Sequence, residues 1–427
     1  MTRYRVGAQP RSRSSIPAKK VIGRTFLDGN VYDHAKQRTR KAIALHDDFS
    51  VNFSGGKDSM TLLEIVIEVA RELDRLPVTV DFVDEEAINP ETEAYCRRTA
   101  ARPEVNFRWW AFPIKCNAAC STRQSVWYPW APEDEHLWVR PYPHDVATPT
   151  PDWIPTRVPS ARLAMQEVLS SMAAQRRGGT SCVFVALRSS ESPTRLNALS
   201  NGRADFWMSP GPLPGSTIAK PIYDWNEQDV WTGVRLFGWD YNASYDLMWQ
   251  HGLSAKMARV GVPFGGESIQ ELDTTPILYP PDYWARLCLR VPGAATALLY
   301  GNTELYAKGS APPKPDGLTY TQWVETLLND LPPIARSREA SHVRAAIRRH
   351  YKATDLPIVP EAPHPDSGVS WHGILNFVLR GDALNRQYLK FGSLRSRAKN
   401  NPDVHAKMLT RYLAELDTWR DRTHELR

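Results

Sequence analysis

The sequence has few cysteines and no long hydrophobic run, and each shortage excludes a class of protein. Its 427 residues contain five cysteines, an odd number that argues against a disulfide framework. No stretch approaches the about 18–20 apolar residues that a helix needs to cross a bilayer. The first residues include arginine and serine and lack the apolar centre of a signal peptide. We therefore expect a cytoplasmic protein with no disulfides and no membrane contact.

Acidic residues are also missing near the N-terminus. None precedes Asp28, and we expect residues 1–25 to form a flexible basic arm in a chain of net charge +6. Two further basic clusters lie in the C-terminal part: Arg336, Arg338, Arg344, Arg348, Arg349 and Lys352, then Arg380, Arg386, Lys390, Arg395, Arg397 and Lys399. Such clusters are typical of surfaces that bind DNA or RNA, although solvated helix faces show the same pattern.

Hydrophobic residues are plentiful at 42%, and 15 Trp and 16 Tyr can help to fill a sizeable core. Strand-like runs alternate with runs of helical periodicity, which predicts an α/β fold with a doubly wound parallel sheet. The predicted strands are 49–53, 78–83, 107–112 and 181–187. The predicted helices are 32–46, 60–73, 91–101, 161–177 and 227–237.

We predict two further parts after the arm. Residues 26–270 form the α/β domain, and residues 275–427 form a mostly helical domain interrupted by proline-rich breaks. Within the α/β domain, residues 113–160 are rich in Pro, Trp and Tyr and interrupt the alternation of strands and helices. We expect this segment to be an insertion or a lid.

The strongest chemical signal is a hexapeptide between a predicted strand and a predicted helix. It consists of Ser54, Gly55, Gly56, Lys57, Asp58 and Ser59. The glycines let the backbone turn tightly and bring N–H groups close to an anion. The helix that follows adds the positive end of its dipole, and both serines can donate a hydroxyl group. The hexapeptide therefore predicts a phosphate-binding loop, and its spacing is not that of a Walker A loop.

Acidic and basic side chains follow two other predicted strands. Asp84 opens an acidic turn after 78–83, where a carboxylate can meet a ribose, a metal or a substrate, or can remain in a solvated turn. Arg188 and Arg195 follow 181–187 and are suited to bidentate contacts with anionic oxygens, with Glu191 placed to orient one of them. A surface ion-pair cluster is the alternative for these three residues.

Two further cations come later in the domain. Lys220 precedes the run 221–231, and lysine can serve as a point charge for phosphate. Arg259 opens the tripeptide Arg-Val-Gly at 259–261.

The hexapeptide SGGKDS resembles the SGGxDS signature of the PP-loop ATP pyrophosphatases. The segments 89–92, 186–195, 221–231 and 259–261 are similar, in the same order, to segments of the phosphoadenosine-phosphosulfate (PAPS) reductase-like family within that superfamily. The resemblance covers roughly residues 45–270. The long aromatic insertion and the helical C-terminal region resemble one branch, described as co-activators of prophage gene expression or immunoglobulin-binding regulators. Such proteins are often paired with a ParB-like protein.

The resemblance implies a nucleotide site. Its expected contacts to ATP or PAPS are Ser54, Gly55, Gly56, Asp58, Ser59, Asp84, Glu191, Arg195, Lys220 and Arg259. It also implies catalytic roles for Asp58, Arg188 and Lys57, and a Mg²⁺ ion that arrives with the nucleotide and meets Asp58. The expected reaction is attack on the α-phosphate with release of pyrophosphate, which activates an unidentified acceptor that can be a nucleic acid. The alternative is a nucleotide-dependent regulator that binds DNA and acts with a ParB-like partner.

The sequence departs from the reductases at their cysteines. Val262 stands where the reductases have a cysteine after Arg-Val-Gly, and residues 422–427 contain none. Sulfonyl reduction requires a thiolate, and an iron–sulfur cluster requires paired thiolates, so we expect neither reductase activity nor a cluster. Cys116 and Cys120 form a CxxxC pair that could hold a metal or act in redox chemistry. A structural zinc site needs about four ligands, which favours free thiols here.

Overall fold

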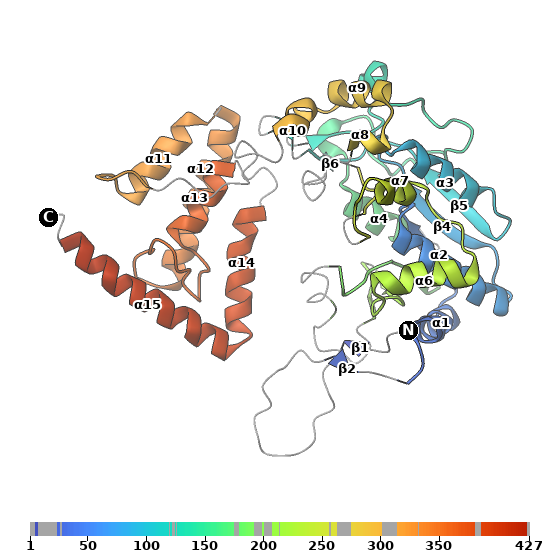
Figure 1. Cartoon of the computed structure of the whole chain (residues 1–427), viewed down its shortest axis with the longest axis horizontal. Helices are drawn as coiled ribbons and strands as arrows, with labels where there is room; N and C mark the ends of the chain where they lie inside the picture. Colours follow the sequence, from blue (N-terminus) through green and yellow to red (C-terminus); the bar gives the residue numbers. More distant parts are fainter. Residues whose placement is uncertain are drawn as a thin grey trace, which may run out of the picture. The chain divides into compact units, whose positions relative to one another are not determined.

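The computed structural model describes residues 5–6, 24–25, 28–118, 120–121, 124, 126–174, 179–191, 199, 207–212, 214–255, 258–262, 275–300, 314–331, 333–380 and 386–424. The chain divides into two compact units (Figure 1). The first, here the sheet unit, comprises Met1–Cys116, Tyr128–Pro263 and Thr274–Arg290; the second, here the helical unit, comprises Asn117–Trp127, Phe264–Asp273 and Val291–Arg427. This division differs from the predicted domain limits, because Thr274–Arg290 lies with the sheet unit.

A six-stranded sheet in the order β5-β4-β3-β8-β10-β9 forms the centre of the sheet unit. Its strands are β3 (Asp48–Phe53), β4 (Val78–Val83), β5 (Val105–Trp110), β8 (Ser181–Phe184), β9 (Met208–Pro210) and β10 (Ser216–Ala219). Every neighbouring pair is parallel except β9 and β10, which are antiparallel. The predicted α/β fold with a parallel sheet is confirmed, although β9 and β10 were not foreseen.

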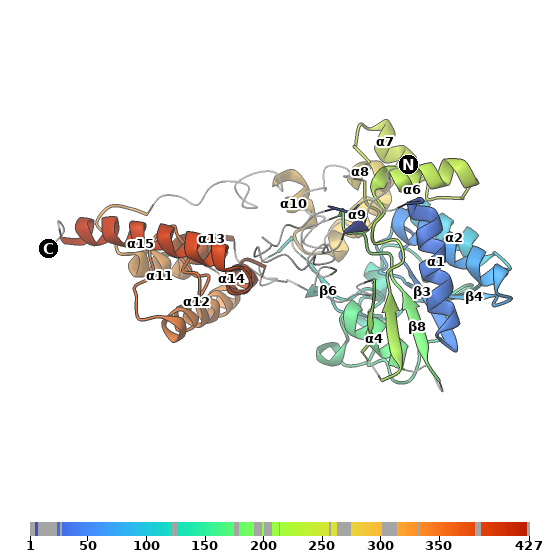
Figure 2. The same ribbon diagram turned by 90° about the horizontal axis from the view of Figure 1, so that it is seen from below.

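The helices of the sheet unit cover both faces of the sheet. They are α1 (Val31–Ala44), α2 (Lys57–Glu72), α3 (Pro90–Ala100), α4 (Met165–Ala174), α6 (Glu227–Phe237), α7 (Ser244–Gln250), α8 (Thr275–Leu278) and α9 (Pro281–Arg290). Figure 2 shows α1 and α2 on the opposite side of the sheet from α4. Right-handed crossovers require this, because the chain adds β4 and β5 on one side of β3 and β8 on the other. The sheet is therefore doubly wound, as predicted.

The change of direction between β3 and β8 creates a switch point. In open α/β sheets, ligands bind in the crevice at the carboxyl ends of the two strands that flank such a point. The hexapeptide loop follows β3, and Arg188 follows β8. Both therefore lie at the edge of the sheet where the topology predicts a ligand.

Helix α2 carries the core beneath this edge. It is buried over most of its circumference, with Leu62, Ile65, Val66 and Val69 among its fully covered side chains. Below the first turn its sequence is a run of leucine, isoleucine and valine, because the sheet lies on one side and α1 and α6 lie on the other. A rigid helix therefore holds the loop from below.

The predicted insertion at 113–160 packs in part against the sheet. Ala147 forms a parallel bridge with Trp109 of β5, and the backbone N–H of Thr148 donates to the carbonyl of Trp109 at 2.7 Å. Trp130 is buried and meets Trp138 and Tyr142 edge-on. The short elements of this region are β6 (Cys116–Asn117), β7 (Val126–Trp127) and the 3-10 helices η1 (Pro132–Leu137) and η2 (Pro159–Ala161).

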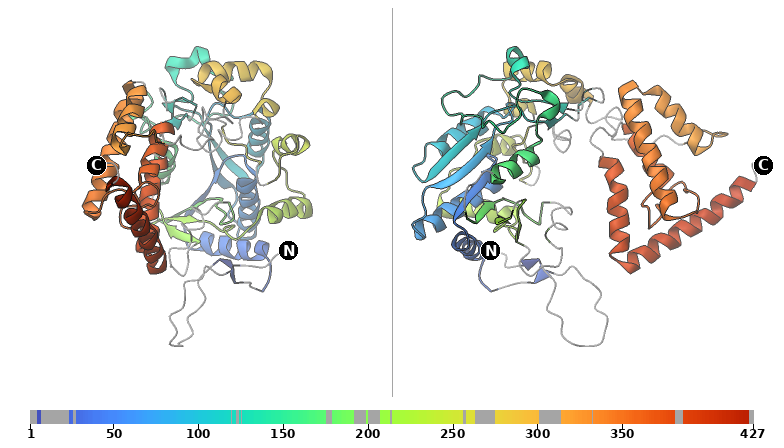
Figure 3. Two further views of the ribbon diagram at one scale, coloured as in Figure 1. Left: turned by 60° about the vertical axis from the view of Figure 1, so that its left-hand side comes forward. Right: turned by 180° about the vertical axis from the view of Figure 1, so that it is seen from behind.

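The helical unit carries six α-helices among the described residues (Figure 3). They are α10 (Ala294–Tyr300), α11 (Tyr320–Asp330), α12 (Pro333–Ala353), α13 (Trp371–Arg380), α14 (Arg386–Lys399) and α15 (Pro402–His424). Its main core gathers Val324, Val343, Phe377 and Phe391 from α11, α12, α13 and α14. The predicted helical character of the C-terminal region is confirmed.

The predicted basic arm lies mostly outside the described residues. Within it the structure describes β1 (Arg5–Val6), which pairs antiparallel with β2 (Arg24–Thr25). None of the described helices is both long and apolar enough to span a membrane.

Candidate nucleotide site at the switch point

The loop after β3 needs glycine at its centre. Gly55 has φ +71°, and a Cβ at this position would lie 3.0 Å from Thr92 Cγ2 and 3.2 Å from Cys96 Sγ. Both the backbone conformation and the lack of space therefore exclude larger residues. The side chain of Asn242 fixes the same peptide from the other side, because its Nδ2 donates to the Gly55 carbonyl at 3.0 Å.

The two serines of the loop hold each other. The backbone N–H of Ser54 donates to Ser59 Oγ at 3.2 Å, the two hydroxyls lie 3.1 Å apart, and Ser59 Oγ donates to the Gly56 carbonyl at 2.9 Å. Gly56 is the N-cap of α2 and supplies no side chain to cap the helix. An N-terminus of this kind leaves backbone N–H groups for an anion, and with the glycine turn it fits a phosphate group.

Asp58 and Arg188 meet across the switch point. Arg188 Nε donates to Asp58 Oδ1 at 2.8 Å, and Arg188 Nη1 donates to Ser190 Oγ at 3.1 Å. The arginine side chain is 4% exposed and the aspartate side chain 17% exposed. The pair thus joins the first turn of helix α2 to the loop after β8 and places both charges beside Gly55 and Gly56. These two residues, predicted from separate motifs, are brought together.

Lys57 has a different environment from its neighbour Asp58. Its amine donates to the Ala258 carbonyl at 2.8 Å, lies 3.3 Å from Glu227 Oε1, and sits 5.3 Å from the centre of the Tyr245 ring. Its backbone N–H donates to the Tyr245 hydroxyl at 2.9 Å. Lys57 is buried and connects the loop to residues 258–260. Its predicted catalytic role stays a prediction, in a position where the amine already has two partners.

Residues 258–260 run beside the loop. Ala258 and Val260 are buried, while Arg259 between them is exposed. A Cβ on Gly56 would lie 3.4 Å from Val260 Cγ2, so residues 258–260 lie against the glycine turn of the loop. The expected nucleotide contact by Arg259 stays a prediction.

Asp84 is fully buried and its carboxylate is occupied. The Trp109 indole donates to Asp84 Oδ2 at 2.8 Å, the Glu86 backbone N–H donates to Oδ1 at 2.9 Å, and the guanidinium of Arg140 pairs with Oδ2. Neither the solvated turn nor an open carboxylate is found here. The expected nucleotide contact of Asp84 stays a prediction that would require these partners to move.

Glu86 and Glu85 complete the acidic turn. Glu86 accepts the backbone N–H groups of Trp130 and Val139 and pairs with Arg290. Burial raises the pKa of Glu85, whose Oε1 lies 3.5 Å from the thiol of Cys116. The turn is thus a charged cluster inside the protein.

The remaining predicted residues lie at the same edge or beyond the described residues. Lys220 follows β10, its amine donates to Ser209 Oγ at 2.9 Å, and burial lowers its pKa. The backbone N–H of Glu191 lies 3.4 Å from the Arg188 carbonyl. Arg195 falls outside the described residues. Among the described residues, no hydrogen bond joins the Lys220 amine to the glycine turn.

Sequence reasoning missed the residues that brace the loop from behind. Asn242 Nδ2 also donates to Thr92 Oγ1 at 2.8 Å, and Ser244 Oγ donates to Asn89 Oδ1 at 2.8 Å. Together with Tyr245 they form a buried polar layer under the turn. The run 241–245 (YNASY) has no helical or strand periodicity. Its polar residues, a short distance after the segment 221–231, are the only signal that could have suggested a role beside the loop.

None of the five cysteines forms a disulfide. Burial raises the pKa of both Cys96 and Cys116, so these thiols stay protonated at neutral pH. Among the described residues, no group of three or more His, Cys, Asp or Glu side chains could hold a metal ion.

The strand order, with the SGGKDS loop at the switch point, defines a doubly wound α/β fold. Residues 252–354 match a family described as a domain of unknown function, DUF3440. The uncharacterized protein YbdN of Escherichia coli (strain K12) is 29% identical over 372 residues, which cover 83% of this chain and 88% of YbdN.

Two solved structures match parts of this chain at low identity. The PAPS reductase of Candida auris, as a phosphate complex, has a TM-score of 0.29 at 16% identity and covers 50% of this chain and 84% of its own. The FMN adenylyltransferase of Candida glabrata has a TM-score of 0.31 at 12% identity and covers 61% of this chain and 85% of its own.

Proposed function

We propose that the chain binds ATP through the loop Ser54–Ser59 and cleaves it at the α-phosphate, transferring the adenylyl group to an acceptor. The observation that carries the proposal is the Asp58–Arg188 pair, since it holds opposite charges beside a phosphate-type glycine turn at the switch point. The loop amides and the α2 N-terminus would hold the β- and γ-phosphates. Arg188 would stabilise charge that develops at the α-phosphate.

The bond changes are those of an adenylyl transfer. An acceptor oxygen forms a bond to the α-phosphorus and loses its proton to solvent. The bond from that phosphorus to the bridging oxygen breaks, and pyrophosphate leaves with the electron pair. A Mg²⁺ ion bound with the nucleotide would neutralise part of the charge on the leaving group, with Asp58 as the nearest carboxylate of the loop.

Reductase chemistry is not part of the proposal. The pKa of each of the thiols Cys96, Cys116 and Cys288 is raised by burial, and the protonated thiol is a poor nucleophile. Position 262, where the resembling reductases have a cysteine, is a valine and supplies no thiol.

One observation favours a second candidate, a nucleotide-dependent regulator. Lys57 and Asp58, the two charged side chains of the loop, are both paired within the protein. A site whose charges are already compensated suits binding without turnover. The resemblance to prophage co-activators, with a ParB-like partner and DNA binding, belongs to this candidate.

The test is pyrophosphate release from ATP with Mg²⁺, measured beside ATP binding by calorimetry. Asp58→Asn should lower release at least about 100-fold, since it removes the charge that orients Arg188. The matched control is Asp240→Asn, which removes an exposed carboxylate that also pairs with an arginine, Arg98. It should keep full release.

The outcomes separate the candidates. Release that depends on Asp58 but not on Asp240 supports adenylyl transfer. ATP binding with no release by the wild type, with or without DNA or RNA, favours the regulator and overturns the enzyme. Neither binding nor release overturns both.

A further inference from the structure

The helices of the helical unit differ sharply in charge. Helices α12 and α14 carry six and five Lys or Arg residues, while α12 has one acidic residue and α14 has none. Helix α11 shows the opposite bias, with two acidic residues and no basic one. Positive charge is therefore concentrated on two helices that also pack against each other.

The one acidic residue of α12 does little to offset this charge at the surface. Glu339 is fully buried, where it accepts from Arg338 Nε at 2.7 Å and lies 3.1 Å from His342 Nδ1. Between the two helices, Arg349 reaches Tyr388 of α14, and its buried Nη1 has no hydrogen-bond partner among the described residues. Arg349, one of the six cations counted for α12, therefore keeps its positive charge between the two helices.

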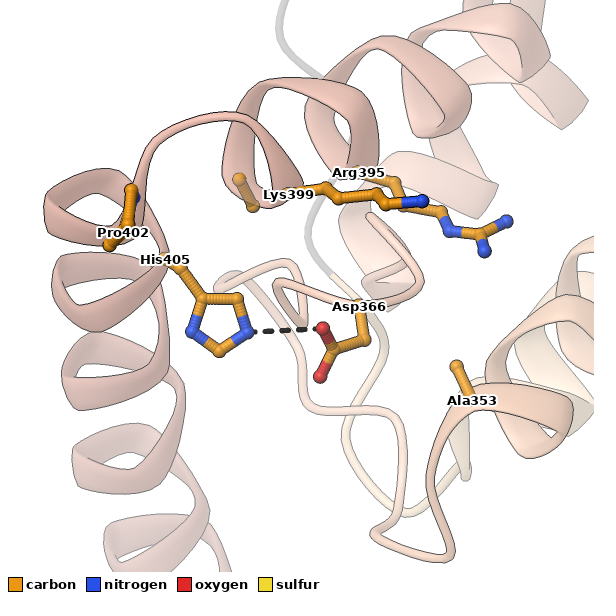
Figure 4. Close-up of a pocket in the computed structure, with 7 residues that line it drawn as sticks. Ala353, Asp366, Arg395, Lys399, Pro402 and His405 are labelled. Carbon is orange, nitrogen blue, oxygen red and sulfur yellow. Dashed lines mark hydrogen bonds and ion pairs between the residues drawn. The ribbon is translucent and has the colours of Figure 1, made fainter.

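A pocket of about 590 Å³ lies at the C-terminal end of α14. Arg395 and Lys399 line it from α14, His405 from α15, and Asp366 from the loop before α13. Figure 4 shows the two cations on one side of the pocket and His405 bonded to Asp366 on the other, at 3.0 Å from Nε2 to Oδ1. Arg395 and Lys399 are both exposed. In the described part of the chain, neither of them forms an ion pair with a carboxylate.

We propose that α14 and this pocket bind the phosphodiester backbone of a nucleic acid, with one phosphate lying between Arg395 and Lys399. A small phosphate would need a single cluster of charge. The 14 residues of α14 instead spread their cations over a helix of about 20 Å, which is the length scale of several consecutive phosphates. Asp366 is held by His405 and leaves the two cations available to the ligand.

This inference does not rest on the proposed function, because its residues lie in the helical unit and those of the ATP loop lie in the sheet unit. Loss of one activity should leave the other unchanged, which makes the two proposals separable by experiment.

The experiment measures binding of the full chain to a fluorescent 30-base-pair DNA duplex and a matched RNA by anisotropy, over a series of salt concentrations. The test variant is Arg395→Gln with Lys399→Gln. The matched control is Lys407→Gln with Arg411→Gln, two exposed cations of α15 that do not line the pocket. Both variants lose the same charge, from +6 to +4 (6 − 2).

The test variant should bind at least about 10-fold more weakly at low salt and reduce the slope of log K against log salt by about 1, because the contact to the one phosphate between Arg395 and Lys399 is lost. The control should change both quantities little. Thermal unfolding and ATP binding should be the same in all three proteins.

Three results would overturn the proposal: equal losses in the two variants, an unchanged salt slope in the test variant, or no binding of DNA and RNA by the wild type. Binding to vesicles with anionic lipid that equals binding to nucleic acid, and that is lost in the same variant, would assign the surface to membranes instead. A preference for DNA over RNA or the reverse would identify the ligand within the proposed class.

Discussion

The loop after β3 and the turn after β4 lie at the same edge of one sheet, and both are rich in polar residues, yet they differ in what surrounds them. The loop holds its charges in two separate pairs, Asp58 with Arg188 and Lys57 with Glu227, next to an uncapped helix. The turn has Asp84 and Glu86 fully buried under tryptophan side chains and two arginines. The first lies at the switch point and the second lies one strand away from it. Position relative to the switch point, more than composition, thus separates the proposed ligand loop from a structural turn.

The largest expected effect comes from breaking the turn. Asp84→Ala would leave the buried Arg140 without its main partner and the Trp109 indole without an acceptor. Removing one member of a buried ion pair costs about 3–5 kcal/mol of unfolding free energy. Urea unfolding measures this loss. Asp145→Ala, which removes a mostly exposed partner of Arg97, should cost less than about 1 kcal/mol. Equal costs would show that the turn is not the buried cluster described above.

The next largest effect should come from the glycine of the loop. Gly55→Ala adds a Cβ 3.0 Å from Thr92 Cγ2 at a positive φ, so the loop must shift. We expect a loss of about 1–3 kcal/mol and at least about 10-fold weaker ATP binding. Gly238→Ala is the matched control, because Gly238 has φ +65° and nothing within 4 Å of the added Cβ. Gly238→Ala should show the backbone strain alone and leave the ATP affinity unchanged. A fall in the ATP affinity of Gly238→Ala would argue against a steric effect at Gly55.

A loss of stability of similar size is expected from the layer beneath the loop. Tyr245→Phe removes the acceptor of the Lys57 backbone N–H and should cost about 1–3 kcal/mol, because a buried donor is left unsatisfied. If a bound phosphate takes over this N–H, the loss should shrink in saturating ATP. Thermal shift with and without ATP measures the difference. Tyr241→Phe, whose hydroxyl bonds the exposed Asp246, serves as the control.

The smallest effect concerns pH. Burial raises the pKa of Glu85 above its unfolded value, so the folded state favours the protonated acid. The stability that protonation supplies is present below the unfolded pKa of about 4.3 and is lost as pH rises through the folded pKa. Glu85→Gln should therefore be more stable than the wild type at pH 7, and the two should converge near pH 4. Urea unfolding at both pH values checks this, and a constant difference would exclude the titration of Glu85 as its cause.

Much of the sheet could be predicted from local sequence, with limits that have a physical cause. The strand at 78–83 was predicted to the residue, and the helix at 227–237 as well. β5 runs Val105–Trp110 rather than 107–112, because the ladder with β4 ends where Val83 pairs with Trp110. β8 stops at Phe184 instead of Leu187, because the chain then turns at the sheet edge and brings Arg188 to Asp58.

The environment of each predicted side chain could not be read from its motif. Asp84 was expected near a nucleotide because of its place after a strand. Its partner Arg140 comes from the insertion, 56 residues later, and no local pattern links the two. The same holds for Asn242 and Tyr245, which reach the loop from more than 180 residues away. Motifs gave the positions of charges, and long-range contacts decide which charges stay available.

The contacts of Lys57 with Ala258 and Tyr245 affect the order in which the protein can fold during its synthesis. Lys57 and Ala258 are 201 residues apart in the chain. Asn242, which bonds Gly55, and Tyr245 also follow the last strand of the sheet. A nascent chain released as far as α6 already contains every strand of the six-stranded sheet, but it lacks Asn242, Tyr245 and Ala258, which hold the loop. The proposed nucleotide site is therefore completed only when residues 242–258 leave the ribosome, long after the sheet that supports it can form.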